Sequence, residues 1–175
     1  MKKIIYILIF NLIFILSINA KNHNLVQVAE LNKLFDDLSK ISNAQDGDVL
    51  EKKIWAVWNK HPNQKKLTEK LEFGTKLMYQ GQYDYALEVF TNIIETDPEW
   101  SEAWNKRATL LFLMKDYQKS LDDISKVLDL EPRHFGALSG RAQIYIDLEL
   151  YQNALKDLKD ARKIHPVIRG NKLIN

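Results

Sequence analysis

Histidine, carboxylate and hydroxyl side chains could supply catalytic chemistry in this chain, but their spacing assembles no site. The four histidines, His23, His61, His134 and His165, are scattered, and none has the spacing of paired metal ligands on one helix. A metal site needs several convergent ligands, so we interpret these histidines as residues at helix joints or on the surface. The chain contains no cysteine, which excludes disulfides, thiolate catalysis and thiolate metal sites.

The carboxylate and hydroxyl candidates do not form a catalytic pair either. Asp122 and Asp123 are adjacent, so on a helix they point to different faces and cannot act as paired acid and base. Ser120 has no candidate base near it in the sequence, and no Gly-rich phosphate loop is present. We therefore predict a protein that is not an enzyme, with no catalytic residue, metal or cofactor.

Length, composition and charge define the class of protein. Helix-forming and charged residues dominate, Gly and Pro are few, and no strand-like alternation is evident, which indicates an all-α fold. Without the first twenty residues the chain has 155 residues (175 − 20), enough for one compact domain. Removing Lys2 and Lys3 leaves 23 basic side chains (25 − 2) against 23 acidic ones. A neutral chain lacks the basic excess of a nucleic-acid binder, so no nucleic-acid partner is expected.

An internal repeat organises the second half of the chain. The segment Tyr83–Leu87 recurs as Tyr117–Leu121 and Tyr151–Leu155, with a Tyr, a small residue and a Leu each 34 residues apart. Two further series share this spacing. One consists of the small residues Gly74, Ala108 and Ala142, and the other of the prolines Pro98, Pro132 and Pro166. Several unlinked positions with one period indicate stacked structural repeats.

These positions resemble the tetratricopeptide repeat, a helix-turn-helix unit with the pattern W-x2-L-G-x2-Y, A-x3-F and P. Trp104, Ala108 and Pro132 match it in the second unit, and Phe90 matches it in the first. The resemblance implies an α-solenoid of antiparallel helix pairs in a right-handed superhelix. It places the repeats at residues 67–100, 101–134 and 135–168, followed by a tail at 169–175.

The first twenty residues have the pattern of a secretory signal peptide. A basic start precedes an apolar run over residues 4–18, and Ala20 offers a small residue for cleavage. The apolar run is short for a membrane span, although an uncleaved anchor is the alternative. The absence of cysteine excludes a bacterial lipoprotein anchor.

Residues 21–66 are expected to form a helix pair without the signature residues of the repeat. Apolar residues at helical spacing predict helices at residues 25–40 and 49–60, separated by a polar turn at 42–48. Terminal units of such arrays are atypical, so we expect this pair, as a cap or degenerate repeat, to cover the free face of repeat one. We also expect burial of Trp55, Trp58 and Trp100 rather than a role as binding hot spots.

The resemblance implies that the first helix of each repeat lines a concave binding surface. The predicted partner groove consists of Thr75, Tyr79, Asn105, Lys106, Thr109, Phe112, Ser139, Gly140 and Gln143. Carboxylate-clamp members of the family use Lys, Asn and Arg at groove positions that here include Thr75, Gly136 and Gly140. Lys106 is the single cation among them, so that function is not carried over.

Gly136, Ser139 and Gly140 form an unusual bare strip, because glycine is costly inside a helix. The strip could admit a partner's bulky side chain or backbone, and the alternatives are that it receives this chain's own C-terminal tail or frays. A small-ligand carrier or enzyme using the Gly136–Gly140 hollow is therefore a further hypothesis.

The predicted function is protein–protein interaction, with a peptide or partner protein bound in the groove. The resemblance is to tetratricopeptide proteins of the bacterial cell envelope, so the expected location is periplasmic or secreted. An assembly factor anchored in the inner membrane is the alternative, and membrane contact is expected only if the N-terminal segment stays uncleaved. We expect a monomer, with self-association through terminal helices as the alternative.

The small residues of the repeat predict close contact between the two helices of each unit. Ala86→Leu should overpack that contact in repeat one and lower the free energy of unfolding by about 1–3 kcal/mol. Urea denaturation followed by circular dichroism measures this change. Unaltered stability would show that position 86 does not face the other helix.

Overall fold

The computed structural model describes residues 25–168, and every regular element in that range is an α-helix. Residues 25–39 form the first helix. The others are α2 (Ala44–Trp58), α3 (Lys65–Tyr79), α4 (Tyr83–Thr96), α5 (Ser101–Leu113), α6 (Tyr117–Leu130), α7 (Phe135–Asp147) and α8 (Tyr151–Ile164). The predicted all-α class is confirmed. The predicted signal peptide and the tail at 169–175 lie outside the described residues.

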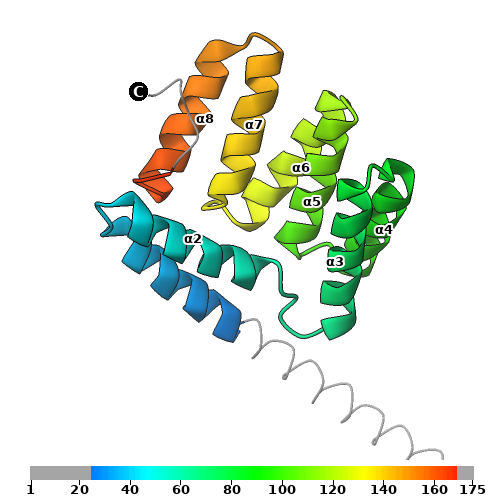
Figure 1. Cartoon of the computed structure of the whole chain (residues 1–175), viewed down its shortest axis with the longest axis horizontal. Helices are drawn as coiled ribbons and strands as arrows, with labels where there is room; N and C mark the ends of the chain where they lie inside the picture. Colours follow the sequence, from blue (N-terminus) through cyan, green and yellow to red (C-terminus); the bar gives the residue numbers. More distant parts are fainter. Residues whose placement is uncertain (1–24, 169–175) are drawn as a thin grey trace, which may run out of the picture.

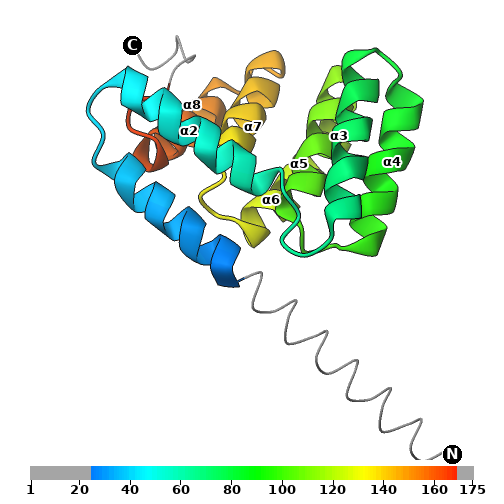
Figure 2. The ribbon, with the colours of Figure 1, turned by 60° about the horizontal axis from the view of Figure 1, so that its bottom comes forward.

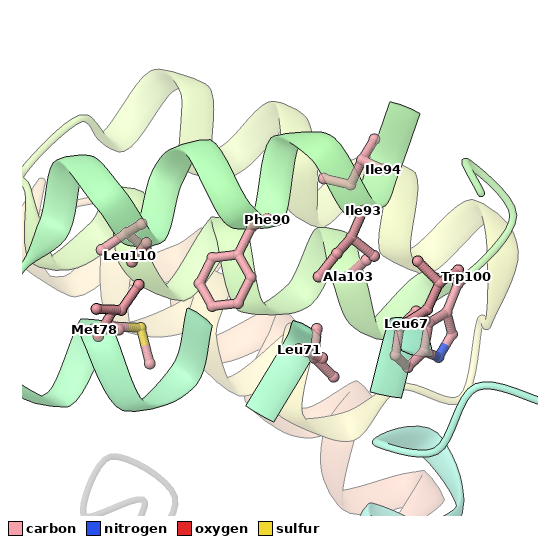
Figure 3. Close-up of a cluster of buried hydrophobic side chains, with 11 residues drawn as sticks. Leu67, Leu71, Met78, Phe90, Ile93, Ile94, Trp100, Ala103 and Leu110 are labelled. Atoms are coloured by element: carbon pink, nitrogen blue, oxygen red, sulfur yellow. The ribbon is translucent and has the colours of Figure 1, made fainter. Parts of the chain in front are cut away.

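Helices α3 to α8 form three antiparallel pairs that stack side by side (Figure 1). Small residues allow each pair to close, as the 34-residue period predicts. Ser120 Oγ donates a hydrogen bond of 2.8 Å to the carbonyl oxygen of Ala108, across α5 and α6. A Cβ at Gly74 would lie 2.7 Å from the Phe90 ring, closer than real contacts allow. Figure 3 shows that ring in the core of repeat one, between α3 and α4.

The turn inside each repeat has the same backbone geometry. Gly81, Lys115 and Glu149 follow the first helix of their repeats and all have positive φ, at 74°, 65° and 60°. A left-handed residue at this point ends a helix and reverses the chain. Only repeat one uses glycine there, so Lys115 and Glu149 hold a conformation that costs a side-chain-bearing residue about 1 kcal/mol.

Two ion pairs repeat with the same spacing inside repeats two and three. Arg107 Nε lies 2.8 Å from Asp123 Oδ2, and Arg141 Nε lies 2.7 Å from Asp157 Oδ2. Both guanidinium groups donate a second hydrogen bond to the same carboxylate, which makes the pairs bidentate. Each pair joins the first and second helices of its repeat. Asp123, one of the two neighbouring carboxylates considered for acid–base chemistry, is thus an ion-pair partner within repeat two.

The N-terminal helix pair, residues 25–39 and α2, corrects one prediction. It does not cover the free face of repeat one, and instead lies beside α7 and α8, far from α4 (Figure 1). Phe35, Ile54 and Trp58 share one buried cluster with Phe135 and Ala161 of repeat three. The helix pair is apolar on the side that meets repeat three. Burial of this apolar surface against repeat three stabilises the observed placement of the pair.

Helix α2 runs along the joints between consecutive repeats (Figure 2). Near its C-terminal end, the carbonyl oxygen of Trp58 accepts a 3.0 Å hydrogen bond from Trp100 Nε1 at the first joint. The Trp58 ring also stacks on His134 at the second joint, with centroids 4.0 Å apart and planes at 7°. Near its N-terminal end, Gly47 lies against Val167, which follows α8 at the end of the third repeat. Trp58 and Trp100 are 4% and 6% exposed, so their predicted burial is confirmed.

Helix α2 also starts earlier than predicted. Asn43 caps it, because the side-chain oxygen accepts a 2.9 Å hydrogen bond from the backbone nitrogen of Asp46. The predicted polar turn at 42–48 therefore shortens, and Gly47 lies inside the helix. A glycine is needed there because a Cβ would collide with Val167.

Trp58→Ala should destabilise the array, because it removes the buried ring that stacks on His134 at the second joint and packs among Phe35 and Phe135. We expect a loss of about 3–5 kcal/mol in the free energy of unfolding, typical of a buried Trp truncation. Urea denaturation measures it, with Tyr79→Ala as the matched control, since Tyr79 is 82% exposed. Equal effects of the two substitutions would contradict the arrangement of α2.

Candidate functional site

A hollow between α5 and α7 brings together most of the predicted groove. Its volume is about 310 Å³, and its walls are mainly apolar, from residues such as Ala108, Ile124 and Ile144. Six predicted groove residues line it, and they are Asn105, Thr109, Phe112, Ser139, Gly140 and Gln143. Their common position follows from the repeat, because the first helices of adjacent repeats lie next to each other.

A second hollow of about 470 Å³ lies beside α3. Thr75 and Tyr79, the two predicted groove residues of repeat one, line it together with Leu71 and Glu72. The Thr75 hydroxyl donates to the carbonyl oxygen of Leu71 at 2.7 Å, so it is occupied within its own helix. The exposed Tyr79 ring is the larger contact surface of this hollow.

Lys106 and Asn105 are not the freely exposed pair that the sequence suggested. Lys106 Nζ lies 3.0 Å from the Glu102 carboxylate and 5.7 Å from the centre of the Trp55 ring. Asn105 is only 7% exposed and donates to the same carboxylate at 3.2 Å. Lys106 lines neither hollow. Asn105 is thus held within α5, whereas Lys106 also connects α5 to Trp55 of α2.

Within the strip formed by Gly136, Ser139 and Gly140, one end is covered by α2 and the other end is open. A Cβ on Gly136 would lie 2.5 Å from the Trp55 ring, so α2 covers that end of the strip. Nothing lies within 4 Å of a Cβ at Gly140. The hydroxyl of Ser139 is buried and has no hydrogen-bond partner among the described residues. The part of the hollow open to a ligand is thus the end formed by Ser139 and Gly140.

The predicted joint histidines are buried and paired with carboxylates, which the sequence did not reveal. His134 Nδ1 accepts from the backbone nitrogen of Ala137 at 3.0 Å, so Nε2 carries the proton. That Nε2 lies 3.1 Å from Glu102 Oε2. His61 Nε2 similarly lies 2.8 Å from Asp97 Oδ2. The pairs join segments distant in sequence, so spacing along the chain could not have found them.

His165 continues this row at the third joint, where its Nε2 lies 3.1 Å from Glu51 Oε2 of α2. Each of the three pairs is one histidine with one carboxylate. Among the described residues, no cluster of three or more metal-ligating side chains occurs. The arrangement therefore positions helices at the joints.

Glu102 is a fully buried carboxylate, and its charge is compensated locally. Burial opposes its ionisation, but the hydrogen bond from His134 and the charge of Lys106 outweigh it. The pKa of Glu102 therefore lies below its ordinary value of 4.5. This buried carboxylate therefore stays ionised and paired at neutral pH.

Comparison with known proteins agrees with this geometry. The sequence model of the tetratricopeptide repeat family matches residues 101–134, the limits predicted for the second repeat. The chain has a tetratricopeptide-repeat fold. No curated protein matches the sequence.

Solved tetratricopeptide domains superpose on the stack of helices. The first such domain of Spaghetti (RPAP3), bound to the HSP90 peptide SRMEEVD, has 25% identity and a TM-score of 0.56. The match covers 59% of this chain and 82% of that one. The TPR2B domain of yeast Sti1, in a complex with pHsp70, has 23% identity, a TM-score of 0.55 and coverages of 58% and 81%. The domain of Arabidopsis OM64 has 20% identity, a TM-score of 0.56 and coverages of 63% and 88%.

Within residues 25–168, no helix combines the length and the apolar character needed to cross a membrane.

Glu102→Gln should change how stability depends on pH. Because the pKa of Glu102 is lower in the folded chain than in the unfolded chain, the carboxylate stabilises the fold above about pH 4.5 and this contribution is lost as pH falls further. We expect the variant to lose about 1–3 kcal/mol at pH 7 and to be less sensitive to acid. Urea titrations between pH 7 and pH 3 measure both effects, with Glu99→Gln at an exposed position as control. Parallel pH profiles for wild type and Glu102→Gln would contradict the assigned role.

Proposed function

We propose that this chain is a non-catalytic interaction module that binds a peptide segment of a partner protein in the groove along α3, α5 and α7. The observation that carries this proposal is the hollow between α5 and α7, which is apolar and ends at the open Gly140. The peptide complexes of the structural neighbours support binding of this general kind.

The ligand we propose is an uncharged, mainly apolar segment. Beside the hollow between α5 and α7, the ammonium of Lys106 is paired with Glu102 and lies over the Trp55 ring. The HSP90 peptide bound by the neighbour, SRMEEVD, is acidic at its end. None of the described residues that line the hollow between α5 and α7 is charged. An acidic peptide terminus would therefore find no cation there to pair with. Apolar side chains entering beside Gly140 suit its walls instead.

We further propose that the chain acts as a monomer in the periplasm or outside the cell, after removal of residues 1–20. The basic start, apolar run and Ala20 of the sequence support export, while an inner-membrane anchor is the alternative. The equal numbers of acidic and basic side chains in residues 21–175 support a protein partner rather than nucleic acid. Sequencing the N-terminus of the protein isolated from cells distinguishes the two locations. A terminus at Lys21 supports export, and an intact Met1 supports the anchor.

Gly140→Leu should abolish peptide binding, because the side chain fills the open end of the hollow. A photo-crosslinking amino acid at Gln143 identifies the bound partner segment in cells, and the segment is then made as a labelled peptide. We expect Gly140→Leu to weaken its binding at least about tenfold, equivalent to about 1.4 kcal/mol. Fluorescence anisotropy measures the affinity.

Lys126→Leu on α6 is the matched control, since Lys126 lines neither hollow. It should bind the peptide as wild type does. Equal affinity of folded Gly140→Leu and wild type would overturn the groove assignment. A small molecule that stabilises wild type but not Gly140→Leu in thermal-shift assays would favour a carrier of small ligands.

A further inference from the structure

The free face of repeat one is apolar at the positions where repeats two and three carry their ion pairs. Phe73 and Val89 stand 34 residues before Arg107 and Asp123. Arg107 also donates to Thr91 of the preceding repeat at 3.2 Å, so this position faces the neighbouring repeat. Repeat one has no preceding repeat, because the N-terminal helix pair lies elsewhere. Its apolar pair is thus left at the surface, with Phe73 55% exposed.

A large surface hollow surrounds these residues. Its volume is about 1090 Å³, and Phe73, Leu77, Tyr85 and Val89 are among its lining residues. Tyr85 is 66% exposed. The terminal unit of a repeat array normally needs a polar outer face to remain soluble, and this unit has the opposite character. An exposed apolar surface of this kind marks an interaction site.

The opposite end of the array shows the expected polar termination. Leu128 of repeat two packs against α7 of repeat three. The equivalent residue 34 positions later is Arg162, which is exposed, and it is followed by the exposed Lys163. The last repeat thus ends with charged residues, whereas the first repeat does not.

The rim of the repeat-one hollow is acidic. Asp84, Glu88 and Glu95 of α4 line it, and none has an ion-pair partner among the described residues. Lys70 is the one cation in the lining, and its Nζ donates to Asn92 at 2.7 Å. Three free carboxylates around an apolar surface are complementary to a ligand with apolar and basic faces.

We propose that the face of repeat one formed by Phe73, Leu77, Tyr85 and Val89 docks a basic amphipathic helix of another protein. The apolar side of that helix covers Phe73 and Val89, in the place where a preceding repeat would pack. Its Lys or Arg side chains pair with Asp84, Glu88 and Glu95. The hollow of repeat one shares no lining residue with the two hollows of the peptide groove. Both ligands can therefore bind to one molecule.

Two synthetic helical peptides test the proposal. Each has the length of the 14-residue α4 and a leucine face, and the opposite face carries Lys in one peptide and Glu in the other. By fluorescence anisotropy at moderate salt, the Lys peptide should bind at least about tenfold more tightly than the Glu peptide. The double variant Phe73→Arg with Val89→Asp should lose at least about tenfold of the Lys-peptide affinity.

That double variant installs the ion pair of repeats two and three, so it should fold, and it leaves the net charge unchanged. Gly140→Leu is the control, and should bind the Lys peptide as wild type does, which separates this surface from the peptide groove. Equal binding of both peptides, or full affinity in a folded double variant, would overturn the proposal. Concentration-dependent self-association in sedimentation that the double variant abolishes would overturn it too, because a second copy would then occupy the face.

Discussion

The stacking of Trp58 on His134 joins the N-terminal helix pair to the repeat array, and the placement of the other joints follows from it. His134 lies between repeats two and three, where it caps α7 and pairs with the buried Glu102. Trp58 covers this ring on one side and accepts a hydrogen bond from Trp100 at the previous joint. One helix thereby contacts consecutive joints, and relative tilting of the repeats would break these contacts. The curvature of the solenoid is in this way coupled to the position of α2.

The same arrangement shapes the groove. Because α2 follows the row of joints, Trp55 covers Gly136 and the ammonium of Lys106, and Gly140 remains open. The hollow between α5 and α7 therefore has one end closed by α2 and no charged side chain among the described residues that line it. Placing the helix pair here also leaves the first face of the array, around Phe73, uncovered by the rest of residues 25–168. The two candidate binding surfaces thus have a common structural origin.

The sequence was most informative where one residue type recurs with the 34-residue period. The close contact of Ala108 with Ser120 was predictable for this reason, and so were most helix limits in the repeats. Arg107 and Arg141 are 34 residues apart, as are Asp123 and Asp157, and this shared spacing was a usable signal for the two ion pairs. The contacts of α2 could not be predicted, because each occurs once. No periodicity links Glu51 to His165 across the length of the chain. The apolar spacing identified the helix pair and left open which apolar surface it would meet.

An engineered disulfide tests the course of α2 most directly, and the absence of native cysteine makes the result unambiguous. A Cβ at Gly47 would lie 3.7 Å from Val167 Cβ, within the range of about 3.5–4.5 Å that disulfides require. The double variant Gly47→Cys with Val167→Cys should therefore oxidise to an intramolecular bond, seen as loss of free thiols and faster migration on a non-reducing gel. Gly81→Cys with Val167→Cys is the control and should keep its thiols. If the first variant also keeps its thiols, or forms only intermolecular bonds, α2 does not run along the joints and the account of the groove fails.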